Sequence, residues 1–515
     1  MITQRTFAIA TLLAAAVLLV LAWPTAPSVV DDAWISARYA RSFALGHGLV
    51  YDAGQPPIEG FTNLLWTLML ALASRAGVSL HATMISAGLV GGVLSVFASA
   101  ALANEVARDR DGRVSAVALL APFGLALDPH LAVVTTNGLE SSLFLAAVLG
   151  TTWAVVAEQR GLGALFAIAT IALRPEGAAV VAVLATLDLA RGISKPEHWA
   201  IGGAGAVTLA AITLFRIVQY GSLVPNTFAA KAGKPLAERL AFDVAYLRPD
   251  GGFWMIGLGI AFFGQVLAWR TGARVAATAV GSLVILLVAV AFSVDMWMPG
   301  GRLLLAPLAL AWSLFAGALA RVRLPMTRIT ALVIAADLVL LPVTPWARVV
   351  RAADVAHSAQ PRNAAERAMR SLGAQLPEGA WLVTRDAGVL AYFVGAHVHV
   401  AEIHPRALTQ PHPGGRDLDP RDVVPERPDL VVLTVEDPHA RAPFYEMDRA
   451  VFASLREPYT FLGRVRQHHQ RYYDVWARSD LALPALPEAL RVGSLEPPYA
   501  PSTPGSAPAP RSSEP

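Results

Sequence analysis

Two adjacent carboxylates, Asp31 and Asp32, follow the first apolar run of the chain and are the best candidates for acid–base chemistry. Neighbouring residues on a helix point about 100° apart, so only one of the two can face a given substrate. This does not match the carboxylate pair that flanks a water molecule in glycosidases. It favours one general base, whose proton affinity is raised by the like charge beside it. The alternative role is to cap the helix that follows, and both roles are compatible.

The segment 33–45 is predicted to be an amphipathic helix at the membrane interface. Arg38 lies seven residues after Asp31 and therefore shares its face. We expect its guanidinium to pair with Asp31 or to bind a lipid phosphate through two parallel hydrogen bonds. The alternative is that Arg38 and Arg41 extend toward the lipid headgroups without binding a substrate.

Further polar residues lie where apolar runs end, although they come from separate parts of the sequence. An ionisable side chain at membrane depth costs about 2.5 to 3.5 kcal/mol, so their gathering at one boundary predicts a shared substrate site. The alternative is that polar residues simply occur in loops. Besides Arg38, the predicted donor-phosphate and substrate-binding residues are His47, Glu59, Asn63, Asn137, Glu140, Arg174, Glu176, Asn226, Lys231, Asp295, Arg302 and Asp386.

Arg174 and Glu176 flank Pro175, which interrupts an apolar stretch. A helix break at membrane depth is tolerated where protein or water surrounds it, so this turn is predicted to face a cavity. Either Arg174 meets the donor phosphate there, or the two charged residues form a structural pair.

Several other chemistries lack support in the sequence. The absence of cysteine excludes disulfides and thiolate metal sites. His397, His399 and His404 match no standard zinc motif, so no metal site is predicted. No cofactor is required by the sequence, and a divalent-metal requirement stays open. The net charge is +3, and the Arg residues cluster in short loops between apolar runs. This placement is typical of residues that set the orientation of a protein in the membrane, so no nucleic-acid binding is predicted.

The composition is that of a polytopic α-helical membrane protein. Of the 515 residues, 55% are hydrophobic and 15% are charged, with a mean hydropathy of +0.49. With the Arg-rich loops in the cytoplasm, eleven transmembrane helices and a cytoplasmic N-terminus are predicted, together with a partly embedded first-loop helix at 61–76. The predicted spans are 7–23, 81–105, 114–127, 139–157, two short helices within 162–190, 199–219, 251–269, 275–292, 303–320 and 330–345.

Three regions are expected along the chain. They are a transmembrane catalytic domain at 1–346 with a first outer loop at 24–80, a small C-terminal α/β periplasmic domain at 347–490, and a disordered Pro/Ser/Ala-rich tail at 491–515. Helices near 363–372, 388–395 and 443–455 and strands at 380–384, 397–402, 429–435, 459–465 and 471–477 are predicted in the α/β domain. Asp386 directly follows a strand, where such sheets often bind ligands, and a turn-forming role is the alternative.

The first outer loop resembles that of the GT-C membrane glycosyltransferases. The resemblance begins with Asp-Asp-Ala-Trp-Ile-Ser-Ala-Arg-Tyr in segment 31–51 and with Ile-Glu-Gly-Phe-Thr-Asn-Leu-Leu-Trp at 58–66. Within that superfamily the chain is most similar to the mycobacterial terminal β-(1→2)-arabinofuranosyltransferase family. The match continues in order through 136–140, 174–177, 220–228, 295–302 and 386–393.

This resemblance implies an inverting glycosyltransferase that takes a sugar from a polyprenyl-phosphate donor at the periplasmic face of the bacterial inner membrane. It implies that Asp31 or Asp32 is the catalytic base and that the acceptor is a cell-envelope glycan or glycolipid. A pentose such as arabinofuranose is one candidate sugar. The alternative is a non-catalytic transporter or flippase of lipid-linked sugars, and an assembly scaffold without activity is a third reading.

Overall fold

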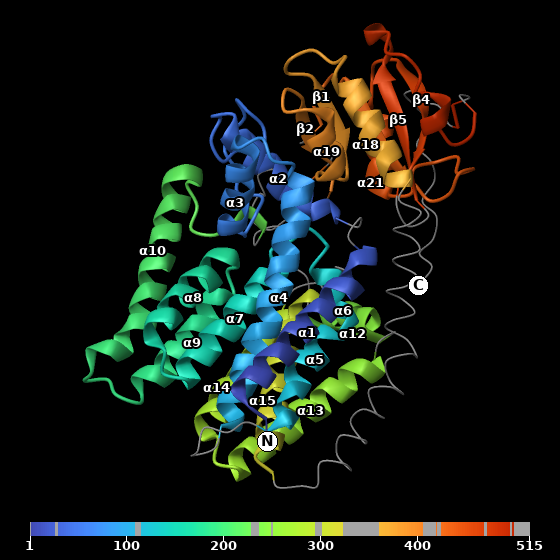
Figure 1. Cartoon of the computed structure of the whole chain (residues 1–515). Helices are drawn as coiled ribbons and strands as arrows, with labels where there is room; N and C mark the ends of the chain where they lie inside the picture. The colour runs from blue at the N-terminus through green and yellow to red at the C-terminus, as the bar shows by residue number, and fades with distance from the viewer. Residues whose placement is uncertain are drawn as a thin grey trace.

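The structure is a computed structural model in which a bundle of helices carries a unit of strands and helices against one end (Figure 1). The N-terminus lies at the opposite end of the bundle. The described residues are 2–25, 29–108, 115–227, 236–248, 251–293, 301–322, 360–404, 419, 424–467, 471–494 and 497–498.

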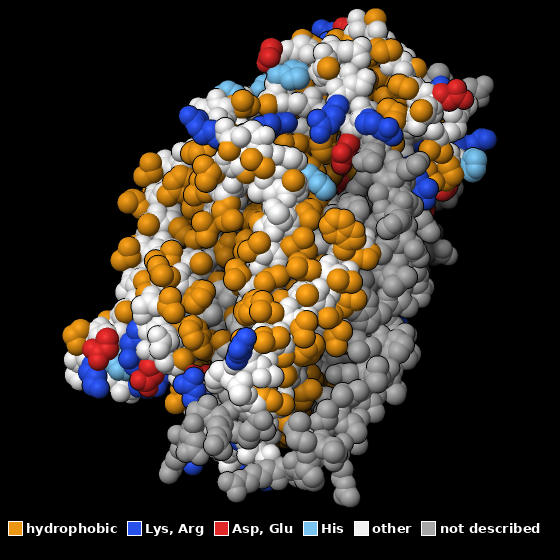
Figure 2. All heavy atoms as spheres, viewed as in Figure 1, with side chains coloured by type: hydrophobic (Ala, Val, Ile, Leu, Met, Phe, Trp, Pro, Cys, Tyr) orange, Lys and Arg blue, Asp and Glu red, His pale blue; other side chains and the backbone are white. Residues whose placement is uncertain are grey.

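Long apolar helices form the bundle. In the described part of the chain, six are long and apolar enough to cross a membrane: α1 (Gln4–Ala22), α4 (Leu80–Ala107), α10 (Ala200–Tyr220), α13 (Gly251–Arg270), α14 (Arg274–Ala291) and α15 (Arg302–Ala320). Hydrophobic side chains cover the flank of the bundle seen in Figure 2, and charged side chains gather toward its two ends. The chain is therefore a multi-pass membrane protein.

Shorter helices pack among the long ones. They are α5 (Leu120–Ala126), α6 (Pro129–Val134), α7 (Ser141–Val156), α8 (Arg160–Leu173), α9 (Gly177–Leu189) and α12 (Leu236–Leu247), with 3-10 turns at Trp23–Thr25, Ala116–Leu119 and Pro196–Trp199. The two short helices predicted within 162–190 are confirmed as α8 and α9. The run predicted as a span at 114–127 is only a short helix, Ala116–Ala126. The predicted span at 330–345 lies outside the described residues, so the total of eleven stays a prediction.

Small residues bring α4, α6 and α7 into close contact. A Cβ added at Gly88 would lie 2.1 Å from the carbonyl oxygen of Thr135, the residue that directly follows α6. The Ser142 hydroxyl of α7 donates to the Gly88 carbonyl at 2.8 Å. Close approach through glycine and hydroxyl hydrogen bonds is typical of helix packing in membranes, where lipid gives no hydrophobic drive for association.

The C-terminal unit is an α/β structure around one five-stranded sheet. Its strands are β1 (Trp381–Thr384), β2 (His399–Glu402), β3 (Leu430–Val435), β4 (Tyr459–Arg466) and β5 (Tyr472–Arg478), in the order β2-β1-β3-β5-β4. β1 pairs in parallel with β2 and β3, whereas β5 pairs antiparallel with β3 and β4. The helices are α18 (Gln360–Gly373), α19 (Val389–Val394) and α21 (Glu446–Ser454). Each strand and helix expected here is present, with ends shifted by a few residues.

The first loop lies at the end of the bundle that carries the α/β unit, beside that unit (Figure 1). It contains α2 (Asp31–Ala44) and α3 (Leu64–Arg75), the latter being the short helix predicted at 61–76. One apolar cluster extends from Leu18 of α1 through Trp34 of α2 to Leu390 of α19. The α/β unit therefore shares its core with the membrane bundle through α2.

The close contact at Gly88 gives a test of the packing. Gly88→Ala should destabilise the detergent-solubilised protein by about 1 to 3 kcal/mol, because the methyl group meets a backbone carbonyl. Gly203→Ala in α10 is the matched control, since a Cβ there meets no atom within 4 Å, and it should leave the melting temperature unchanged or raise it. Equal melting temperatures for the two variants would contradict this packing.

Candidate active site

Asp31 begins α2 and reaches the first turn of α19. One carboxylate oxygen accepts the N–H of Gly388 at 3.1 Å, and the other accepts that of Val389 at 2.7 Å. Asp31 is thus a helix cap, but it caps a helix of the α/β unit and not the helix that follows it. A Cβ at position 388 would lie 2.0 Å from the Asp31 carbonyl oxygen, so this approach requires glycine.

Arg38 is held in a way that contradicts its predicted pairing with Asp31 or a phosphate. It is only 2% exposed, and its Nη2 donates to the Asp52 carboxylate at 2.5 Å. It also donates to four backbone carbonyls, those of Tyr51, Ala391, Gly395 and Val398. A buried guanidinium needs such compensation for its lost hydration, and Asp52 supplies the nearest carboxylate. Arg38 therefore fastens the first loop to the α/β unit.

Aromatic packing and further hydrogen bonds complete this docking interface, by which we mean the contacts between residues 31–52 and 387–400. The Trp34 ring packs against those of Tyr392 and Phe393, with centroids 4.8 and 4.7 Å away. The Tyr51 hydroxyl donates to the Ala387 carbonyl at 2.5 Å. Asp52 also accepts the N–H of Val400 at 2.8 Å, so one carboxylate serves both Arg38 and β2.

The charge of Asp386 acts on the carboxyl group of Asp31 at the docking interface. Burial raises the pKa of Asp31 well above its usual range, and the charges of Asp386 and Asp32 raise it further, against the two N–H donors. Burial also raises the pKa of Asp386, although the Tyr473 hydroxyl donates to it. Gln467 donates to the same Asp386 oxygen at 2.7 Å. The candidate ligand residue of the α/β unit thus lies near the predicted base.

A second cluster links the start of α7 with the turn between α8 and α9. Glu140 is 2% exposed and accepts from Asn63 Nδ2 and from Arg174 Nη1, each at 2.7 Å. Arg174 Nε donates to Glu176 at 2.5 Å. The mutual pair of Arg174 and Glu176 is therefore present, and Glu140 extends it to a network that reaches the first loop.

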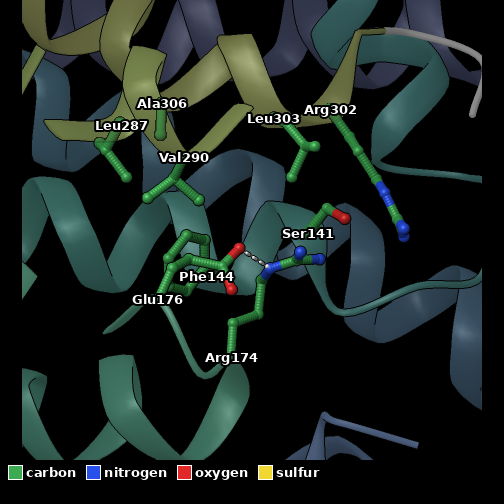
Figure 3. A pocket seen from close by; sticks show the side chains of 9 residues that line it. All are labelled: Ser141, Phe144, Arg174, Glu176, Leu287, Val290, Arg302, Leu303 and Ala306. Atoms are coloured by element: carbon green, nitrogen blue, oxygen red, sulfur yellow. Dashed lines mark hydrogen bonds and ion pairs between the residues drawn. The ribbon is translucent and has the colours of Figure 1, made fainter. Parts of the chain in front are cut away.

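A small pocket lies beside this network (Figure 3). As predicted, Arg174 and Glu176 face a cavity. Arg302 enters it from the start of α15 and forms no ion pair with any residue that the structure describes. The charges of Arg174, Glu140, Asp32 and Glu176 act on its half-buried guanidinium. The pocket is lined by Ser141, Phe144, Arg174, Glu176, Leu287, Val290, Arg302, Leu303 and Ala306.

Glu59 and Asn226 lie in a different contact. Arg216 of α10 donates to both carboxylate oxygens of Glu59, at 2.5 and 3.0 Å. The Asn226 N–H donates to the Glu59 carbonyl at 3.1 Å. These contacts tie the first loop to the end of α10, so the predicted convergence on one site does not extend to this pair.

The remaining predicted residues are also dispersed. His47 is exposed in the loop after α2. The Asn137 side-chain oxygen accepts the N–H of Leu139 at 2.9 Å, which shapes the turn before α7. Lys231 and Asp295 lie outside the described residues.

The three histidines considered for metal binding do not form a site. His397 Nε2 bonds to the Gly373 carbonyl at 3.0 Å, and the His399 ring packs on Trp381. Across the described ranges, no group of three or more His, Asp or Glu side chains is arranged to hold a metal ion.

The sequence patterns do not single out Asp52 or Ser141, although both lie in the regions described above. Asp52 directly follows the segment 31–51 that carries the resemblance, and Ser141 directly follows segment 136–140. Their positions beside these motifs are the one signal that points to them.

Comparison with known proteins gives a partial relative and a shared fold. No family model matches the chain. Over 248 residues it is 28% identical to the terminal β-(1→2)-arabinofuranosyltransferase of Mycobacterium tuberculosis. That match covers 43% of this chain and 38% of the relative, so the chain spans well under two thirds of the relative's length.

The solved structures of ArnT from Cupriavidus metallidurans superpose on nearly the whole chain. The structure bound to undecaprenyl phosphate has a TM-score of 0.56 at 14% identity and covers 90% of this chain and 97% of ArnT. The apo structure has a TM-score of 0.57 at 15% identity and covers 92% and 98%. The chain therefore shares the fold of ArnT, and the partial match to the mycobacterial arabinofuranosyltransferase bears out the resemblance seen in the sequence.

The docking interface should weaken as pH rises. Because the docked state raises the pKa of Asp31, it binds a proton more tightly than the undocked state, and the docking interaction weakens as pH increases from about 4 through the raised pKa of Asp31. Amide hydrogen exchange at Gly388 and Val389, corrected for the intrinsic exchange rates, measures the weaker docking as a loss of protection of these two N–H groups at higher pH.

Asp386→Asn should flatten this pH dependence because it removes the charge that raises the pKa of Asp31. Asp480→Asn, on the exposed 3-10 turn Ser479–Leu481, is the control and should not change it. A pH dependence that Asp386→Asn leaves intact would refute the coupling.

Proposed function

We propose that this chain is an inverting glycosyltransferase that moves a sugar from a polyprenyl-phosphate donor to a cell-envelope glycan or glycolipid. The observation that supports it most is the pocket lined by Arg302 and Arg174. Arg302 has no ion-pair partner among the described residues, and the negative charge of Asp32 acts on its guanidinium. A cationic site and a carboxylate within electrostatic reach of each other are what transfer from a phosphate ester requires.

Arg302 and Arg174 are assigned to the donor phosphate. Negative charge grows on the phosphate as its bond to the sugar breaks, and guanidinium groups stabilise it through directed hydrogen bonds. Arg174 is already fixed by Glu140 and Glu176, which holds its position, whereas Arg302 has its donors available. The undecaprenyl phosphate in the ArnT crystal supports a lipid phosphate as the ligand of this fold.

Asp32 is assigned as the base in preference to Asp31. Both oxygens of Asp31 accept N–H groups of α19, while the charge of Asp32 acts on Arg302 in the pocket. Asp32 takes the proton of the acceptor hydroxyl as its oxygen forms a bond to the anomeric carbon. The bond from that carbon to the phosphate breaks on the opposite face, and polyprenyl phosphate leaves with its electron pair.

We further propose that the site faces the periplasm of the bacterial inner membrane, with the α/β unit outside. Arg108, Arg160 and Arg274 lie at or next to the far ends of α4, α8 and α14, and cytoplasmic loops are rich in Arg and Lys. The partial match to an arabinofuranosyltransferase supports arabinofuranose as the first sugar to test. The three regions of the chain and their boundaries at 346 and 490 are part of this proposal.

A flippase of lipid-linked sugars is the rival function. It needs polar groups along a path through the bilayer, whereas the paired charges here lie next to the first loop, through Asn63 and Glu140. Incubation of the purified protein with a panel of polyprenyl-phosphate sugars and envelope glycans separates the two. A glycosylated product supports the transferase, and movement of the donor across proteoliposomes without product supports the flippase.

The two aspartates should differ when each is changed to asparagine. Asp32→Asn should lower kcat by at least about 100-fold while donor binding is retained, because general-base catalysis contributes about that much or more. Asp31→Asn should instead reduce the exchange protection of Gly388, with a smaller fall in kcat. Full transfer by the Asp32 variant would remove it as the base.

Arg302→Gln should weaken polyprenyl-phosphate binding by about tenfold to 100-fold, the range for losing hydrogen bonds to a charged group. Arg274→Gln, the same change at the exposed start of α14, is the matched control and should bind as the wild type does. Titration by thermal shift measures both, and equal affinities of the two variants would exclude Arg302 from the site.

A further inference from the structure

The Ser141 hydroxyl is a buried polar group in the pocket that lacks a partner. Ser141 is the first residue of α7 and is 6% exposed. Its Oγ has no hydrogen-bond partner in the part of the chain that the structure describes. Buried hydroxyl groups are normally satisfied, so one left open at a pocket wall indicates a ligand atom.

The surroundings of this hydroxyl favour an anion. Figure 3 shows the Ser141 side chain between the guanidinium groups of Arg174 and Arg302. Ser141 also opens the 16-residue helix α7, whose first-turn N–H groups give its N-terminus a partial positive charge. The residue before it, Glu140, makes no side-chain cap to these N–H groups, because both its oxygens accept from Asn63 and Arg174.

We infer that the Ser141 hydroxyl and the N-terminus of α7 bind the phosphate of the lipid-linked donor, a diester that becomes the polyprenyl phosphate monoester when the sugar leaves, an inference that rests on the proposed function. A phosphate offers only acceptor oxygens, so the hydroxyl donates. Arg302 supplies charge from α15 and Ser141 supplies a directed neutral donor from α7. The phosphate is therefore held between two helices that meet at the pocket.

The next residue provides a matched control on the same helix turn. Ser142 is fully buried, and its hydroxyl donates to the Gly88 carbonyl of α4 at 2.8 Å. Its hydroxyl therefore stabilises the packing of two helices and does not line the pocket. Ser141→Ala removes the hydroxyl assigned to the ligand, whereas Ser142→Ala removes a hydroxyl that holds α7 against α4.

The experiment titrates the detergent-solubilised full chain with a short-chain polyprenyl phosphate and, separately, with inorganic phosphate, and follows the melting temperature. Ser141→Ala should leave the melting temperature of the free protein unchanged or slightly raised and weaken polyprenyl-phosphate binding about tenfold. Ser142→Ala should lower the melting temperature of the free protein and keep wild-type affinity.

Each other outcome has a distinct meaning. Wild-type affinity in Ser141→Ala would overturn the role of Ser141 and leave the proposed function standing. A wild-type protein that does not bind polyprenyl phosphate would refute the proposed function itself. Inorganic phosphate that binds as tightly as the lipid, with the same loss in Ser141→Ala, would overturn the assignment to a lipid donor.

Discussion

The capping of α19 by Asp31 is the interaction on which the arrangement of the whole molecule depends. The donors and the acceptor are 357 and 358 residues apart in the sequence, so two hydrogen bonds join the first loop to the α/β unit. Arg38 and Asp52 reinforce the same contact with buried hydrogen bonds. Because Asp32 is the next residue after Asp31, the position of the proposed base is set by this cap, and not by the membrane bundle alone.

The sequence was most informative where a pattern is local. Apolar runs predict the bundle helices, and Pro175 predicts the break between α8 and α9, because proline removes a backbone donor and ends a helix. Charged residues at the ends of apolar runs led to Arg174, Glu176 and Arg302, which do share one pocket. The alternation of short strands and helices likewise identified the α/β unit, since each element has its own periodicity.

Long-range partners were not accessible in this way. The spacing of Arg38 and Asp31 indicates a shared helix face. What Arg38 contacts depends on residues far along the chain, such as Ala391, whose carbonyl accepts from it 353 residues later. Glu59 showed the same limit, because its partner Arg216 lies inside an apolar helix with no motif around it. Ser141 was hidden for a further reason, since an unpartnered hydroxyl can be recognised only when the packing around it is known.

The shortness of α8 and α9 has a consequence for the surrounding bilayer. With 14 and 13 residues they reach about 21 and 20 Å, less than the roughly 30 Å of a hydrocarbon core. Leu162, Leu165 and Ile168 of α8 are exposed, so lipid contacts this short helix directly. A bilayer adapts to such a mismatch by local thinning, which draws the headgroups of the nearer leaflet toward the turn that carries Arg174. If the pocket binds a lipid phosphate as proposed, that phosphate can then reach it by lateral diffusion within its own leaflet, while its hydrocarbon chain stays in the membrane.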